Sequence, residues 1–141
     1  MKIHIERIDD AFKMKATNQD GKVTFVDGSK SIGASEDAFR PMQLLLTSLA
    51  ACSAIDILNI LKKQRQDVQS FEISAEGQRV DGIPSPFKRI DITFIVAGNV
   101  KEKKLVKAVE LTQGKYCSVY FSLHPEIEIN YHHQLKSAGE E

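Results

Sequence analysis

The sequence predicts an α+β protein with antiparallel sheets and one long central helix. Segments in which apolar and polar residues alternate come in blocks: three segments near the N-terminus, two in the middle and one near the C-terminus. The apolar run 44–61 separates the first two blocks, and it is too long for a strand. Because strands and helices come in blocks, antiparallel sheets are favoured over a doubly wound parallel sheet.

The N-terminal block predicts a small meander of three strands. The strands are expected over residues 4–8, 12–16 and 22–26, with Asp- and Gly-containing turns between them. Residues 29–39 are polar and are expected to form the loop that leads into the central helix.

The central helix is expected to run from Pro41 to Gln64. Proline suits the first turn of a helix, because the N–H it lacks would have no helical partner there. Apolar side chains cover most sides of the helix over residues 44–54, so this half is expected to be buried all round. One small sheet cannot cover such a helix, and we therefore expect an intertwined homodimer that encloses it.

The remaining sequence predicts two strands, two helical segments and a last strand. Gly114 is expected to end the first of these helices. The expected elements are a hairpin of strands over 70–80 and 87–96, a helix over 101–113, a short helix over 116–123, a strand over 127–132 and a frayed tail over 137–141.

Length and charge narrow the classes of function. The chain has 141 residues, which suits one domain over 1–141. Lys+Arg and Asp+Glu both number 19, so the net charge is zero and nucleic acid is not expected as a partner. Asp56 near the centre of the apolar run argues against a membrane span. Two cysteines without a recognisable export signal favour the cytoplasm, where thiols stay reduced.

No motif for a metal or a cofactor is recognised. Neither cysteine belongs to a CxxC motif, and the histidines form no HxxxH or HExxH pattern. The sequence also lacks a GxGxxG or Walker-type loop and a GxSxG turn. We therefore expect no metal and no cofactor, and we expect His132 and His133 to be surface residues on opposite faces of a strand.

The two cysteines remain as candidates for chemistry. Cys52 lies within the central helix and Cys117 lies in the segment KYCSVYFSL. A buried free cysteine often serves only as a small apolar side chain, whereas a reactive thiol needs a positive charge or a helix N-terminus nearby. Cys52 lies too deep in its helix for that effect, while Cys117 is placed to open a short helix. Local structure thus favours Cys117 as the more acidic thiol, and both interpretations of the pair stay open.

Two segments resemble motifs of the OsmC/Ohr family. Residues 40–56 (RPMQLLLTSLAACSAID) are similar to the central helix of the family, with a proline, an apolar start and small residues before the cysteine. Residues 115–119 (KYCSV) are similar to the segment with the second cysteine. Together with QDV at 66–68, they resemble the YhfA-type branch of OsmC-like proteins, and the resemblance covers nearly the whole chain.

The resemblance implies a homodimer with a thiol pair at the subunit interface. It also implies reduction of organic hydroperoxides, with Cys52 as the peroxidatic thiol and Cys117 as the resolving thiol. Cys52 would be oxidised to a sulfenic acid, Cys117 would condense with it to a disulfide, and an external dithiol would reduce the disulfide.

The sequence departs from the peroxidase pattern at Met42. Peroxidase members have a Glu ten residues before the reactive cysteine, and that Glu pairs with an Arg from the N-terminal strands; here the position holds Met42. Arg7 and Arg40 are the candidate cations near Cys52. Two other hypotheses therefore stand beside a redox enzyme: a non-catalytic homodimer that binds a small apolar ligand, and a thiol stress sensor that acts on another protein.

Overall fold

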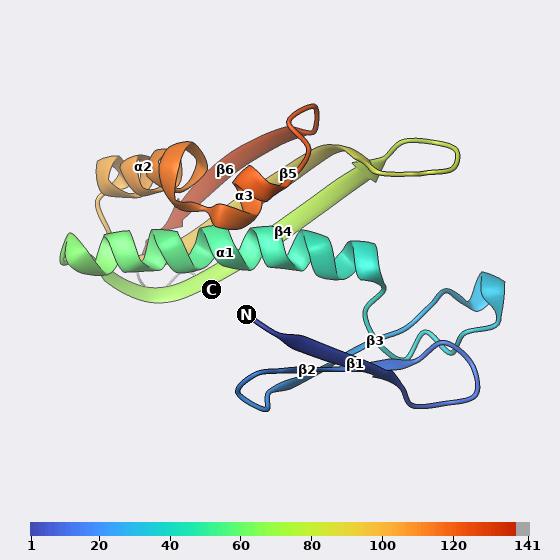
Figure 1. The fold of residues 1–141 in the computed structure, drawn as a ribbon. Coiled ribbons are helices and arrows are strands. Elements are labelled where there is room, and N and C mark those ends of the chain that lie inside the picture. The colour runs from blue at the N-terminus through green and yellow to red at the C-terminus, as the bar shows by residue number, and fades with distance from the viewer. Residues whose placement is uncertain (138–141) are drawn as a thin grey trace. The chain divides into compact units, whose positions relative to one another are not determined.

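The computed structural model describes residues 1–137 and divides the chain into two compact units, Met1–Leu45 and Leu46–Glu141 (Figure 1). The predicted tail over 137–141 lies almost wholly outside the described residues. In chain order the elements are β1 (Ile3–Arg7), β2 (Met14–Asn18), β3 (Val23–Val26), a 3₁₀ turn (Lys30–Ile32), α1 (Pro41–Lys63), β4 (Asp67–Arg79), β5 (Phe87–Asn99), α2 (Glu102–Leu111), a π-helical turn (Thr112–Tyr116), α3 (Ser118–Ser122) and β6 (Glu128–Lys136).

The first unit contains the predicted meander, in which β2 pairs antiparallel with both β1 and β3. The loop after β3 is held by Asp27, whose buried carboxylate accepts hydrogen bonds from the backbone N–H groups of Gly28 and Asp37 at 2.7 and 3.1 Å. The sheet is thinly covered within the single chain, since Ile5 and Phe25 remain 59% and 44% exposed.

The second unit is built on a sheet with the strand order β4–β5–β6. β4 and β5 form the predicted antiparallel hairpin, and the alternation seen in the sequence of β5 is confirmed. Its buried side chains include Ile90, Ile92, Phe94 and Val96. β6, however, pairs with β5 in parallel, so the prediction of purely antiparallel sheets is wrong for this strand. The physical reason is the connection: α2 and α3 return the chain to the opposite end of the sheet before β6 begins.

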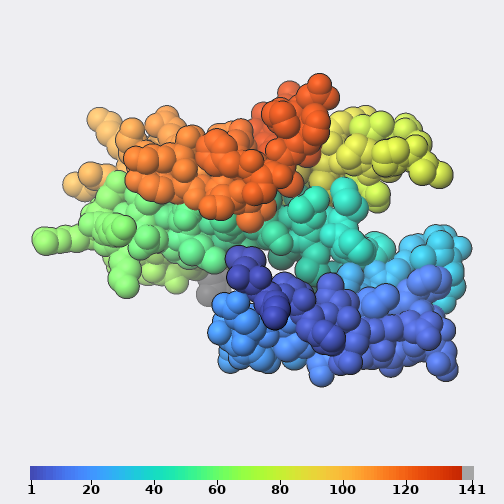
Figure 2. Space-filling view, in the orientation of Figure 1, coloured from blue at the N-terminus to red at the C-terminus, as the bar shows by residue number. Residues whose placement is uncertain are grey.

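The long helix α1 begins at Pro41, as predicted, but in the single chain it is buried along one side only. Its fully buried side chains include Leu49, Ile57 and Leu61, whereas Ile55 and Leu58 are 66% and 38% exposed. Figure 2 shows part of this helix at the surface beside the C-terminal helices. The expectation of a helix covered on all sides is therefore not met by one chain.

Length and composition would also allow α1 to cross a membrane, with a mean hydropathy of 1.9 over an 18-residue window. One third of that window is buried inside the protein, and polar contacts from Ser53 and Asp56 join the helix to the rest of the second unit. These contacts are those of a core helix.

The segment between α2 and α3 differs from the predicted helix end. α2 stops at Leu111 and passes directly into the π-helical turn Thr112–Tyr116, so Gly114 lies within this turn rather than at a helix terminus. The wider turn ends at Cys117, which then serves as the N-cap of α3. Turns of this kind often occur at functional sites, and this one places the second cysteine.

Candidate functional site

The structure brings the two predicted cysteines together in the second unit. Both are free thiols, and the sulfur atoms of Cys52 and Cys117 and a carboxylate oxygen of Asp56 all lie within 4.8 Å of one another. Cys52 and Asp56 are four residues apart on α1, so their side chains lie on the same side of the helix. Cys117 comes from the start of α3, so the site joins two distant parts of the sequence.

Cys117 is not the acidic thiol that its place at the start of a helix predicts. Its sulfur accepts hydrogen bonds from the backbone N–H of Tyr120 at 3.4 Å and from the hydroxyl of Ser53 at 3.5 Å. Burial nevertheless raises the pKa of the Cys117 thiol, because the loss of water outweighs these two bonds. The helix that Cys117 caps has only five residues, so its dipole gives little compensation.

A chain of hydrogen bonds leads from the sheet to the Cys117 sulfur. The hydroxyl oxygens of Ser53 and Tyr131 are 2.5 Å apart, and since Ser53 donates its hydrogen to Cys117, Tyr131 donates to Ser53. Burial raises the pKa of Tyr131, which keeps the phenol neutral and able to donate. Tyr131 is held edge-on to the ring of Phe94, with the ring centroids 5.5 Å apart.

Sequence reasoning missed Ser53 and Tyr131 as members of the site. Ser53 lies directly after Cys52 in the CSAID segment, and this position was its only signal. Tyr131 belongs to a strand 78 residues further along the chain, and no local pattern connects the two.

A hydrogen bond from the π-helical turn holds the carboxylate of Asp56 in place. The hydroxyl of Thr112, which is fully buried, donates a hydrogen bond to one Asp56 oxygen at 3.1 Å. The sequence marked Asp56 only as an obstacle to a membrane span. Its spacing of four residues from Cys52 was the signal that could have placed it beside the thiol.

A cavity of about 290 Å³ adjoins the site through Asp56. It lies between α1 and the π-helical turn. Its lining residues are Asp56, Asn59, Ile60, Lys63, Gln64, Leu111 and Tyr116. The volume is at the lower end of the range for small-molecule pockets.

Met42, Arg7 and Arg40 belong to the first unit, and the choice of the cation that faces Cys52 stays a prediction. The Arg40 guanidinium pairs with the Glu36 carboxylate at 3.4 Å. The pKa of Glu36 is lowered, first by a hydrogen bond from the backbone of Lys30 and then by Arg40.

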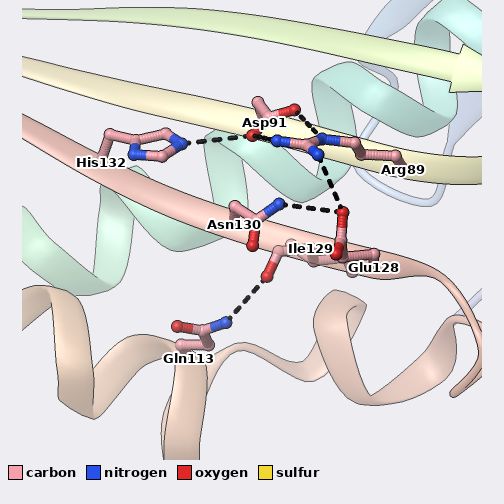
Figure 3. Close-up of polar contacts among 7 residues, drawn as sticks. All are labelled: Arg89, Asp91, Gln113, Glu128, Ile129, Asn130 and His132. Carbon is pink, nitrogen blue, oxygen red and sulfur yellow. Dashed lines mark hydrogen bonds and ion pairs between the residues drawn. The ribbon is translucent and has the colours of Figure 1, made fainter.

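The C-terminal histidines lie beside carboxylates outside the thiol site. His132 contacts Asp91 at 3.2 Å, and His133 contacts Glu102 of α2 at 3.6 Å. Figure 3 shows the first of these pairs within a polar cluster on β5 and β6. There the Arg89 guanidinium donates hydrogen bonds to Asp91 and holds the pKa of that carboxyl well below its usual range.

Comparisons with known proteins point to one family. A family model described as OsmC-like protein matches residues 33–132. Protein YhfA of Escherichia coli K12 is 34% identical over 119 residues, which is 84% of this chain and 86% of YhfA.

Solved structures show the same fold. The crystal structure of a hypothetical protein from Aquifex aeolicus VF5 has a TM-score of 0.84 and 31% identity, with 99% of this chain and 97% of that one covered. The organic hydroperoxide resistance protein OhrB of Bacillus subtilis has a TM-score of 0.61 and 18% identity, with 94% of this chain and 96% of that one covered.

Proposed function

Because the chain belongs to the OsmC-like family, we propose that it is a thiol redox protein that reduces organic hydroperoxides through Cys52 and Cys117. The observation that carries the proposal is the approach of the two free sulfur atoms to within 4.8 Å. A protein of the same fold is named for organic hydroperoxide resistance, which supports the choice of substrate class.

The reaction proceeds in three steps. The Cys52 thiolate attacks the outer peroxide oxygen, the O–O bond breaks, and the alkoxide takes up a proton to leave as an alcohol. The Cys117 sulfur then attacks the sulfenic sulfur of Cys52, and water leaves as the disulfide forms. An external dithiol reduces this disulfide by two exchange reactions and is itself oxidised.

The surroundings of the two thiols support Cys52 as the attacking group. Cys52 is half-buried and open to a substrate, whereas Cys117 is fully buried and its pKa is raised. The Ser53 hydrogen bond to Cys117 favours its thiolate at the moment of resolution. Met42 offers no carboxylate to orient an arginine, so we expect slower turnover than with the Glu–Arg pair of the peroxidase pattern.

The proposal is tested by treating reduced protein with an alkyl hydroperoxide. We expect a Cys52–Cys117 disulfide in peptide mass spectra and peroxide consumption that continues when a dithiol is supplied. Hydrogen peroxide at the same concentration serves as the comparison, because the proposed substrate is an organic hydroperoxide. Protein that forms no disulfide and consumes no peroxide would rule out the enzyme.

The cavity beside Asp56 favours a second candidate, a non-catalytic protein that binds a small apolar ligand. Ile60, Leu111 and Tyr116 form the apolar part of its lining beside four polar or charged residues, and about 290 Å³ suffices for a compact molecule. The hydroperoxide experiment separates the two candidates, since a simple binder leaves the peroxide intact.

We also propose that the protein works as a homodimer in the cytoplasm. Several large apolar side chains are exposed in the single chain, each by at least 44%: Ile5, Phe25, Ile55 and Phe121. A second copy of the chain would bury such apolar surface. A reducing compartment keeps two thiols at this distance free and supplies the dithiol reductant.

Replacing Ile55 with glutamate is expected to weaken the dimer at least about tenfold, a cost of about 1.4 kcal/mol. The reason is that the proposed dimer would bury the new carboxylate on α1, which is exposed at this position in the single chain, without an oppositely charged partner. Sedimentation equilibrium measures the change, with Lys103→Glu on the exposed side of α2 as a control that removes no apolar surface. A wild-type protein that is monomeric at micromolar concentration would refute the dimer.

A further inference from the structure

The group formed by Cys52, Asp56 and Cys117 has a composition that peroxide chemistry does not explain. A thiol peroxidase needs its thiolate stabilised by positive charge. Here the group that lies within 4.8 Å of both sulfur atoms is instead a carboxylate oxygen. A carboxylate supplies no positive charge for a thiolate, so Asp56 has no evident use in the redox reaction.

We propose that Cys52, Asp56 and Cys117 form a binding site for a thiophilic divalent cation, with Zn²⁺ as the ion that fits best. Two thiolates and one carboxylate are ligands that Zn²⁺ accepts, and three protein ligands leave a fourth position for water or another small ligand. Among residues 1–137, this is the group of three potential ligands whose donor atoms converge.

The distances are compatible with tetrahedral coordination. With Zn–S bonds of about 2.3 Å, two sulfur ligands lie about 3.8 Å apart. The donor atoms are already within 4.8 Å of one another, so side-chain shifts of about 1 Å or less complete the site. Cys52 and Asp56 reach the ion from adjacent turns of α1, which is a rigid support.

The charge and the outer contacts also suit a cation. Binding releases two thiol protons to solvent and leaves two thiolates and a carboxylate, whose three negative charges the dication reduces to one. Thr112 donates a hydrogen bond to one oxygen of the Asp56 carboxylate, and the other oxygen has no hydrogen bond from Thr112. Hydrogen bonds of this kind orient the ligands in metal sites. The cavity lined by Asp56 adjoins the site on the side of this carboxylate.

This site does not depend on the proposed redox function. Metal binding requires only reduced thiols, whereas peroxide reduction requires turnover. Bound Zn²⁺ would hold both sulfur atoms and prevent the disulfide, so the two activities exclude each other in time.

The test uses reduced full-length protein under anaerobic conditions, with Co²⁺ as a spectroscopic probe and Zn²⁺ as its competitor. We expect one ion per chain and a sulfur-to-cobalt charge-transfer band, weakened by either cysteine-to-serine replacement. Asp56→Asn should lower Zn²⁺ affinity by about 100-fold or more. Loss of a group that only hydrogen-bonds to a metal ligand already lowers affinity by about 10- to 100-fold. Asp81→Asn, in the exposed β4–β5 loop, is the matched control and should bind as wild type.

A second measurement covers the case in which the variants do not fold. Zn²⁺ should protect Cys52 of the wild-type protein from alkylation, and a chelator should reverse the protection. The proposal is overturned by the absence of a thiolate band, by unchanged affinity in folded Asp56→Asn, or by alkylation that Zn²⁺ does not slow. Failure of peroxide consumption, by contrast, would remove the redox function and leave this site standing.

Discussion

Replacing Cys52 with serine is expected to lower hydroperoxide consumption by roughly 10³-fold or more, to the background rate. Loss of a nucleophile removes the covalent step itself, and its effect is usually of at least this size. Serine keeps the shape of the side chain and the half-buried position on α1, so the fold should be unchanged. The rate is measured with an alkyl hydroperoxide in the presence of a dithiol.

Cys117→Ser provides the matched comparison, because it removes the second thiol and leaves the first. Without added dithiol, this variant should consume one equivalent of peroxide and stop at a Cys52 sulfenic acid, which a sulfenic-acid reagent traps. Unchanged peroxide consumption by Cys52→Ser would contradict the assignment of Cys52. If Cys52→Ser consumed one equivalent of peroxide and Cys117→Ser consumed none, first attack would instead belong to Cys117.

Replacing Gly98 with alanine is expected to lower the free energy of unfolding by about 3 kcal/mol or more. Gly98 has a φ angle of +134°, which costs other residues about 1–3 kcal/mol. A Cβ atom there would also lie 2.2 Å from the backbone oxygen of Asp67, and overpacking of this kind costs about 1–3 kcal/mol more. The close approach arises from the bulge in β4 between Val68 and Ser70.

Gly114→Ala makes the same chemical change with the opposite expected sign. Its Cβ atom would meet nothing within 4 Å, and Gly114 lies in the π-helical turn without a positive φ angle. Alanine should raise the free energy of unfolding by about 0.4–1 kcal/mol, because it restricts the unfolded chain. Urea unfolding of both variants gives the comparison, and a loss below about 1 kcal/mol for Gly98→Ala would contradict the strain at that position.

Elements with a strong local pattern were predicted correctly. The alternation in β5 identified its buried face, and Pro41 marked the start of α1. The direction of β6 was not predictable in the same way, because an alternating strand has the same pattern whether it pairs in parallel or antiparallel. The helix end assigned to Gly114 was wrong because α2 continues as a π-helical turn up to Cys117.

The sequence by itself determined the family, through two cysteine motifs and the order of elements, and it identified Cys52 and Cys117 as the candidate thiols. Only the tertiary structure decided which groups surround them. Ser53, Tyr131 and Asp56 join the thiols through contacts between α1, the start of α3 and β6. Burial, rather than the helix start, then decides the acidity of Cys117. The physical reason is that local patterns report which side of an element is buried, whereas desolvation and charge depend on what the other elements bring to it.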